Sequence, residues 1–173
     1  MTQRWAAMIS GTGSNLQAWL DCADESLPRV VYSSRAGVPG LSKACRMGIP
    51  TVALANPINW DLLDHDLRQR RIQKIFLLGF MKILPASFVK AWEGRMLNLH
   101  PSLLPRYPGL RSFERAWDDQ APLGVTVHRV TADLDAGPCV VQRRFKRAST
   151  FSETRLRLSW TEQSLVREVI SYE

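Results

Sequence analysis

Short apolar runs alternate with helical segments along the first hundred residues. The runs read as buried strands and cover residues 5–9, 29–33, 51–54, 74–78 and 96–100. The segments between them have helical character over 16–20, 39–47, 60–71 and 85–92. Because two parallel strands need a crossover connection, and a helix commonly supplies it, these repeated units predict a doubly wound, mostly parallel α/β sheet.

The last third of the chain follows a different pattern. Residues 112–119 are expected to form a short helix, and residues 124–130 and 139–145 alternate apolar and polar side chains around an acidic turn. Two such strands joined by a turn should pair antiparallel. Ser152, Glu153 and Thr154 are expected to cap a final helix that ends near Ser171. We therefore expect one Rossmann-like domain with an antiparallel C-terminal edge and a terminal helix.

Composition narrows the classes of partner. Hydrophobic residues make up 45% of the 173 residues, but no apolar run is long enough to cross a bilayer, and no signal-peptide core follows Met1, so no membrane partner is expected. The net charge of +7 is dispersed rather than gathered in one block, and we expect no nucleic-acid partner. Cys22, Cys45 and Cys139 are scattered and odd in number, which favours reduced thiols, a cytoplasmic location and no metal site.

The first strand runs into a glycine loop with the sequence Ser-Gly-Thr-Gly-Ser-Asn at residues 10–15. In a strand–loop–helix unit, loop amides and the helix N-terminus converge on an anion, and glycines let the backbone approach it closely. The dinucleotide fingerprint would need glycine at Leu16, and the Gly-Lys-Ser/Thr of a P-loop is absent. The loop therefore favours a monophosphate cradle over the alternative of a plain turn.

A candidate catalytic pair lies at the end of the fifth strand. Asn98 and His100 are two residues apart, so they share one face of an extended strand, and a proline-rich loop follows them. An acid from the turn, Asp133 or Asp135, can fix the tautomer of an imidazole and raise its pKa, while an amide can stabilise an oxyanion. This set suits attack of an amine on a carbonyl. The alternative is a hydrogen-bonded structural histidine. We expect a structural or supporting role for His128 and an exposed structural position for His65.

Five segments, taken in order and at their spacings, resemble the phosphoribosylglycinamide formyltransferase family of folate-dependent enzymes over almost the whole chain. They are Ile-Ser-Gly-Thr-Gly-Ser-Asn-Leu at 9–16, Leu-Gly-Phe-Met-Lys-Ile-Leu at 78–84, Asn-Leu-His-Pro-Ser-Leu-Leu-Pro at 98–105, Tyr-Pro-Gly-Leu at 107–110 and Asp-Leu-Asp-Ala-Gly-Pro at 133–138. The resemblance implies transfer of a formyl group from 10-formyltetrahydrofolate to the amine of glycinamide ribonucleotide, by direct attack through a tetrahedral intermediate and without a metal.

The resemblance also assigns roles to individual residues. It implies Asn98, His100 and Asp135 as the catalytic set, with Asp135 preferred to Asp133, and Glu162 as a contact of the glycinamide end. The phosphate would lie on the loop formed by Gly11, Thr12, Gly13, Ser14 and Asn15. The folate would lie against Met81, Lys82, Ile83, Leu84, Val130, Thr131, Ala132 and Asp133. The phosphate part would span about residues 1–95 and the folate and catalytic part about 96–173, in a monomer or homodimer with a cis bond before Pro105.

The chain also departs from the family in three places. Lys82 stands where arginine is commoner, residues 56–61 lack an arginine that some relatives place near the phosphate, and the usual tail after the last helix is missing. The alternatives are therefore a weakly active or non-catalytic folate- or nucleotide-binding relative, or a formyltransferase for another amine. A methionyl-tRNA formyltransferase would need a further tRNA-binding domain, and a formyltetrahydrofolate hydrolase an N-terminal regulatory domain.

Overall fold

The computed structural model describes residues 3–22 and 27–172 and contains a single seven-stranded sheet within them. Its strand order is β3-β2-β1-β4-β5-β6-β7, and strands β1 to β5 run parallel to one another. The strands are β1 (Trp5–Ile9), β2 (Val30–Ser33), β3 (Thr51–Ala53), β4 (Lys74–Leu77), β5 (Met96–His100), β6 (Leu123–Arg129) and β7 (Cys139–Phe145). The predicted doubly wound sheet is confirmed, and β6 and β7 form its antiparallel edge.

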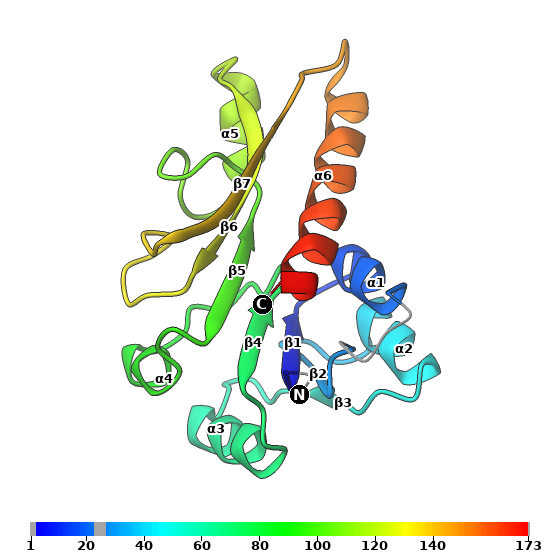
Figure 1. Ribbon diagram of the computed structural model, residues 1–173, viewed down its shortest axis with the longest axis vertical. Helices are drawn as coiled ribbons and strands as arrows, with labels where there is room; N and C mark the ends of the chain where they lie inside the picture. Colours follow the sequence, from blue (N-terminus) through cyan, green and yellow to red (C-terminus); the bar gives the residue numbers. More distant parts are fainter. Residues whose placement is uncertain (1–2, 23–26, 173) are drawn as a thin grey trace.

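Among the described residues, six helices connect and cover these strands (Figure 1). They are α1 (Ser14–Leu20), α2 (Pro39–Arg46), α3 (Trp60–Gln69), α4 (Ala86–Ala91), α5 (Ser112–Asp118) and α6 (Phe151–Tyr172). Their ends follow from local chemistry, since α2 carries proline in its first turn and the Asn59 side chain accepts a 2.9 Å hydrogen bond from Leu62 N–H to cap α3. The predicted cap of the last helix was wrong by two residues. Thr150 and Glu153 form a reciprocal capping box there, because each side chain bonds the other residue's backbone N–H.

Two hydrophobic clusters fill the two faces of the sheet. One cluster includes buried residues of α1, α5 and α6, and the other includes buried residues of α3 and α4. Every residue of β1 is buried, as a strand covered on both faces must be. Alternate residues of β5 also divide between the clusters: Leu97 and Leu99 lie in the first and Met96 in the second.

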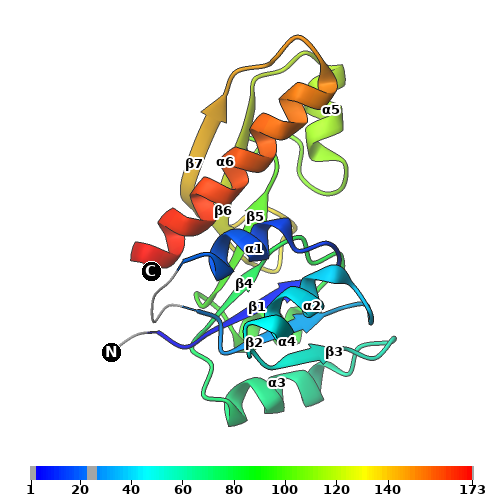
Figure 2. The ribbon, with the colours of Figure 1, turned by 90° about the vertical axis from the view of Figure 1, so that its right-hand side faces the viewer.

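The terminal helix α6 packs against the first helix, α1. It also packs against β6 and β7, and it runs along the β6–β7 hairpin beyond the parallel part of the sheet (Figure 2). The bond between Leu104 and Pro105 is cis, as expected, and so is the bond between Asn56 and Pro57, which was not predicted. No helix among the described residues is long and apolar enough to span a membrane.

Candidate functional site

Strand β5 and the turn after β6 bring Asn98, His100 and Asp135 together. The Asn98 amide donates to Asp135 Oδ1 at 3.3 Å, and His100 Nδ1 lies 3.4 Å from Asp135 Oδ2. Asn98 and His100 therefore share a face of β5, as their spacing predicted. One carboxylate thus contacts both side chains of the predicted pair.

The turn presents Asp135 rather than Asp133 to this cluster. The Asp135 side chain is 8% exposed, whereas Asp133 is an exposed residue. Asp135 has a φ of 52°, a left-handed conformation that costs a residue with a Cβ about 1–3 kcal/mol. The Gly109 amide donates a 2.7 Å hydrogen bond to Asp135 Oδ2 and helps to hold this conformation. The geometry places Asp135 in the cluster and leaves Asp133 at its rim.

His128 is a fourth member of the cluster that the sequence did not assign to it. It lies opposite Asn98 in the β5–β6 ladder and is 2% exposed. Its Nδ1 donates to the Arg129 carbonyl at 3.0 Å, so the neutral ring presents Nε2 as an acceptor for the Asn98 amide at 3.1 Å. A protonated ring would instead donate to Asp135 Oδ1, 3.4 Å away. The alternation of β6 left open whether this side chain faced the core or the cleft.

Electrostatics keep the carboxylate charged. Burial would raise the pKa of Asp135, but the contact with His128, the Gly109 N–H and the histidine charges outweigh it and lower this pKa to about 2. Burial also lowers the pKa of His100, against the opposing effects of its bond to the Tyr107 carbonyl and of Asp135. A charged carboxylate beside a neutral imidazole can accept a proton from a reacting amine at neutral pH.

The glycine loop leaves the first turn of α1 without a side-chain cap. Gly13 is the N-cap residue, with a φ of 67°, and no side chain bonds to the helix start. A Cβ at this position would lie 2.7 Å from Gly40 Cα, so glycine is required for close packing against α2 as well as for its φ. The Lys43 ammonium donates to the Gly13 carbonyl at 3.4 Å. This cation near the loop was not anticipated, although its place on a helix after the second strand was visible in the sequence.

Asn15 and Glu162 connect the loop to α6. The Asn15 amide donates to Glu162 Oε2 at 3.2 Å, and Asn15 Oδ1 is buried without a hydrogen-bond partner among the described residues. Burial raises the pKa of Glu162 to about 7, although the bond from Asn15 and the charge of Arg155 lower it. A buried acceptor without a partner next to a carboxyl group suits a ligand that brings N–H donors.

The two segments expected to bind folate pack against the same hydrophobic cluster. Leu84 and Val130 are both partly buried against it. Met81 and Ile83 are 62% and 87% exposed, and the Met81 N–H is held by Ser10 Oγ at 2.7 Å. In the second segment, the Thr131 hydroxyl donates to the Asp133 carbonyl at 3.2 Å. Lys82, Ala132 and Asp133 are also exposed in these two segments. Exposed apolar side chains on a backbone that is hydrogen-bonded to the sheet are suited to contact an aromatic ring system.

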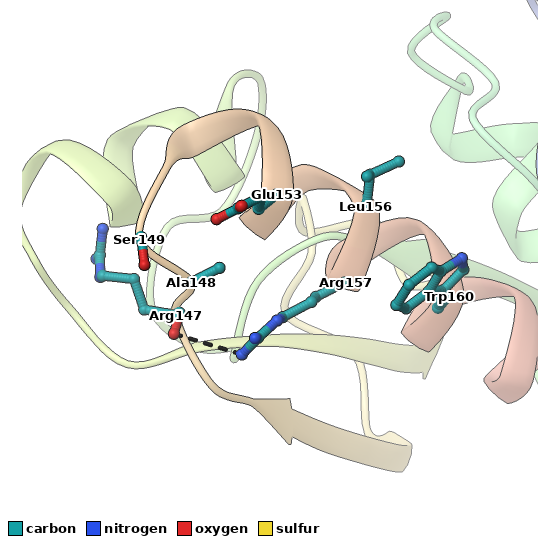
Figure 3. A pocket seen from close by; sticks show the side chains of 7 residues that line it. All are labelled: Arg147, Ala148, Ser149, Glu153, Leu156, Arg157 and Trp160. Carbon is teal, nitrogen blue, oxygen red and sulfur yellow. Dashed lines mark hydrogen bonds between the residues drawn. The ribbon is translucent and has the colours of Figure 1, made fainter.

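An open pocket lies elsewhere, at the start of α6 (Figure 3). Its wall includes Glu153, Arg157 and Trp160, which share one face of the helix, whereas Glu162 lies on a different face. The Arg157 guanidinium donates to the Arg147 carbonyl and so holds the turn before α6. None of the predicted site residues lines this pocket. Across residues 3–22 and 27–172, no group of three or more His, Cys, Asp or Glu side chains is placed to hold a metal ion.

Comparisons with known proteins agree on one family. The sequence pattern of a family described as formyl transferase matches residues 3–169. The chain is 40% identical to a trifunctional purine biosynthetic protein adenosine-3 of Drosophila melanogaster over 81% of this chain, but it spans only 11% of that protein. It is 37% identical to phosphoribosylglycinamide formyltransferase of Escherichia coli, over 95% of this chain and 84% of that protein. A solved phosphoribosylglycinamide formyltransferase of Streptococcus pneumoniae superposes with a TM-score of 0.90 at 29% identity, over 98% of both chains.

Proposed function

Because the chain belongs to the formyl transferase family and, within it, to the phosphoribosylglycinamide formyltransferases, we propose that it transfers the formyl group of 10-formyltetrahydrofolate to the amine of glycinamide ribonucleotide. The observation that carries this proposal is the cluster of Asn98, His100 and Asp135, formed around one charged carboxylate. The reaction would be a step of purine biosynthesis, in the cytoplasm and in a monomer or homodimer.

The two ends of glycinamide ribonucleotide would bind to different elements. The uncapped first turn of α1 would hold the phosphate through the backbone of residues 11–15, with Lys43 as a nearby cation. Asn15 Oδ1 and Glu162 would accept N–H donors of the glycinamide end. Hydrogen bonds from N–H groups of the substrate would favour the charged form of Glu162 and lower its pKa from about 7.

Folate would supply the formyl group, and its ring system would lie against residues 81–84 and 130–133. Residues 1–95 would thus provide the phosphate site and residues 96–173 the folate and catalytic site. Glu162 is the exception to this division, because it belongs to the second part and bonds to Asn15 in the first.

In the proposed reaction the neutral amine attacks the formyl carbon. A carbon–nitrogen bond forms to the amine, the bond from the formyl carbon to the folate nitrogen breaks, and one proton moves from the first nitrogen to the second. His100 and Asp135 would accept and return this proton. The Asn98 N–H groups lie toward His128 and Asp135, and we propose that one of them turns to the oxyanion when substrate enters.

The test is an absorbance assay for folate product on the 173-residue chain, with and without glycinamide ribonucleotide. Product that forms only when the ribonucleotide is present supports the proposal. Binding of both ligands without turnover would favour a non-catalytic relative, and turnover with another amine alone would reassign the acceptor.

A further inference from the structure

The carbonyl of Tyr107 fixes the position of one proton on His100. His100 Nε2 lies 2.9 Å from this carbonyl oxygen, and a carbonyl can only accept, so Nε2 must carry a hydrogen. His100 is 4% exposed, which keeps water from competing for that hydrogen. The remaining ring nitrogen, Nδ1, is the one that faces Asp135 Oδ2 at 3.4 Å. Proton exchange with the substrate must therefore use Nδ1.

The Tyr107 carbonyl is itself held by the hydroxyl of Ser102. Ser102 Oγ donates to the Arg106 carbonyl at 2.7 Å and to the Tyr107 carbonyl at 3.3 Å, sharing its hydrogen between them. Ser102 is 2% exposed, and its own carbonyl accepts a 2.7 Å bond from the hydroxyl of Thr126, which is fully buried on β6. A chain of hydrogen bonds thus runs from the sheet through Ser102 to the carbonyl that faces His100.

The loop needs this support because its backbone is unfavourable at Tyr107. Tyr107 has a φ of 58°, a left-handed conformation that residues with a Cβ rarely adopt. The Tyr107 hydroxyl donates to Asp119 at 2.9 Å, which anchors the side chain at the end of α5. That contact acts on the Tyr107 side chain, whereas the Ser102 hydroxyl acts on the Tyr107 carbonyl directly.

We propose that Ser102 is a positioning residue for formyl transfer: by tethering the Tyr107 carbonyl it keeps the hydrogen of neutral His100 on Nε2 and leaves Nδ1 to handle the working proton beside Asp135. The inference rests on the proposed function for its chemical consequence. The tautomer of His100, in contrast, is a property of the protein without substrate.

The experiment combines kinetics with long-range ¹H–¹⁵N spectra of histidine-labelled protein, in which the two ring nitrogens report the tautomer. The His100 signals are identified by their loss in His100→Gln. Ser102→Ala removes the tether, and Ser102→Thr retains a hydroxyl. Ser112→Ala is the matched control, because Ser112 is also 2% exposed but has no part in this chain of hydrogen bonds. Ser102→Cys, with a weaker donor of similar size, replaces Ser102→Ala if that variant does not fold.

We expect Ser102→Ala to show a mixture of His100 tautomers and a kcat lowered about 10- to 100-fold, with KM for glycinamide ribonucleotide within about twofold. Ser102→Thr should restore both. An unchanged His100 tautomer in Ser102→Ala overturns the proposal. This holds if kcat stays normal, and it also holds if kcat falls together with Tm by as much as in Ser112→Ala. If the wild-type chain shows no formyl transfer, the proposed function fails, while the spectra still decide the role of Ser102.

Discussion

The backbone amide of Gly109 donates a 2.7 Å hydrogen bond to the Asp135 carboxylate and so joins two loops that are 26 residues apart. The same carboxylate accepts from Asn98 through its other oxygen. Asp135 thus ties the proline-rich loop after β5 to the turn after β6, in addition to its proposed part in proton transfer. Replacing it should affect both activity and stability.

Asp135→Asn should lower kcat about 100-fold or more, because an amide cannot accept the proton of the amine. Asp133→Asn is the matched control: it changes an exposed carboxylate two residues away, in the proposed folate site, so it should alter KM for folate more than kcat. Steady-state kinetics of the two variants test the assignment. Equal losses in both variants would show that the turn acts as a unit and not through Asp135.

Asp135 should also contribute to the free energy of unfolding, and this contribution should be lost at low pH. Its pKa falls from 3.8 to about 2 in the folded chain, so its contribution is complete above pH 3.8 and disappears as the pH falls to 2. The shift corresponds to about 2 kcal/mol. Denaturant unfolding between pH 2 and 5 should therefore show a steeper acid loss for wild type than for Asp135→Asn. Parallel curves for the two proteins would contradict this account of the pKa.

His100→Ala should depress kcat by at least about 100-fold and change KM for glycinamide ribonucleotide much less. The reason is that His100 lies in the proposed catalytic cluster, beside Asp135, and not on the proposed phosphate loop. His65→Ala provides the control, since His65 is exposed on α3. Near-normal turnover in His100→Ala would remove His100 from the mechanism.

The free energy of unfolding of Glu162→Gln should depend on pH differently from that of the wild type. The pKa of Glu162 rises from 4.5 to about 7 on folding, so the folded state keeps a proton that the unfolded state loses. Wild type should lose stability relative to Glu162→Gln as the pH rises from 4.5 to 7, by at most about 1.4 kcal/mol per pH unit, and no further above 7. Thermal unfolding measures this difference, with the exposed Glu93→Gln as control. A constant difference across this range would rule out a partly buried Glu162 that is protonated in the folded state.

Gly13→Ala and Gly37→Ala form a matched pair, because both glycines have a φ of 67°. A Cβ at Gly37 meets nothing within 4 Å, so only backbone strain of about 1 kcal/mol is expected. At Gly13 the Cβ would also press on Gly40 Cα, so the loss of unfolding free energy should be larger. Only Gly13→Ala should raise KM for glycinamide ribonucleotide. The phosphate loop would be misassigned if KM changed equally in both variants.

Much of the fold followed from hydrophobic periodicity, because β1 is an apolar run that is buried on both faces and the sequences of β6 and β7 alternate apolar and polar side chains. Contacts across the sheet did not follow from this periodicity. Asn98 lies opposite His128 only because of the antiparallel register between β5 and β6, which periodicity does not give. Lys43 near the Gly13 carbonyl likewise depends on how α2 packs against the loop. The choice of Asp135 over Asp133 came from family resemblance, since both acids lie in the same polar turn.

The packing of α6 on α1 has a consequence for how the chain would respond to its substrate. A ligand held between Asn15 and Glu162 would bridge α1 and α6, so unfolding that separates these two helices would also release the ligand. Its binding free energy would then add to the free energy of global unfolding and would not merely reduce the mobility of a surface loop. Saturating nucleotide should accordingly slow hydrogen exchange in the buried strands β1 and β4 and not only in the loop that holds the ligand.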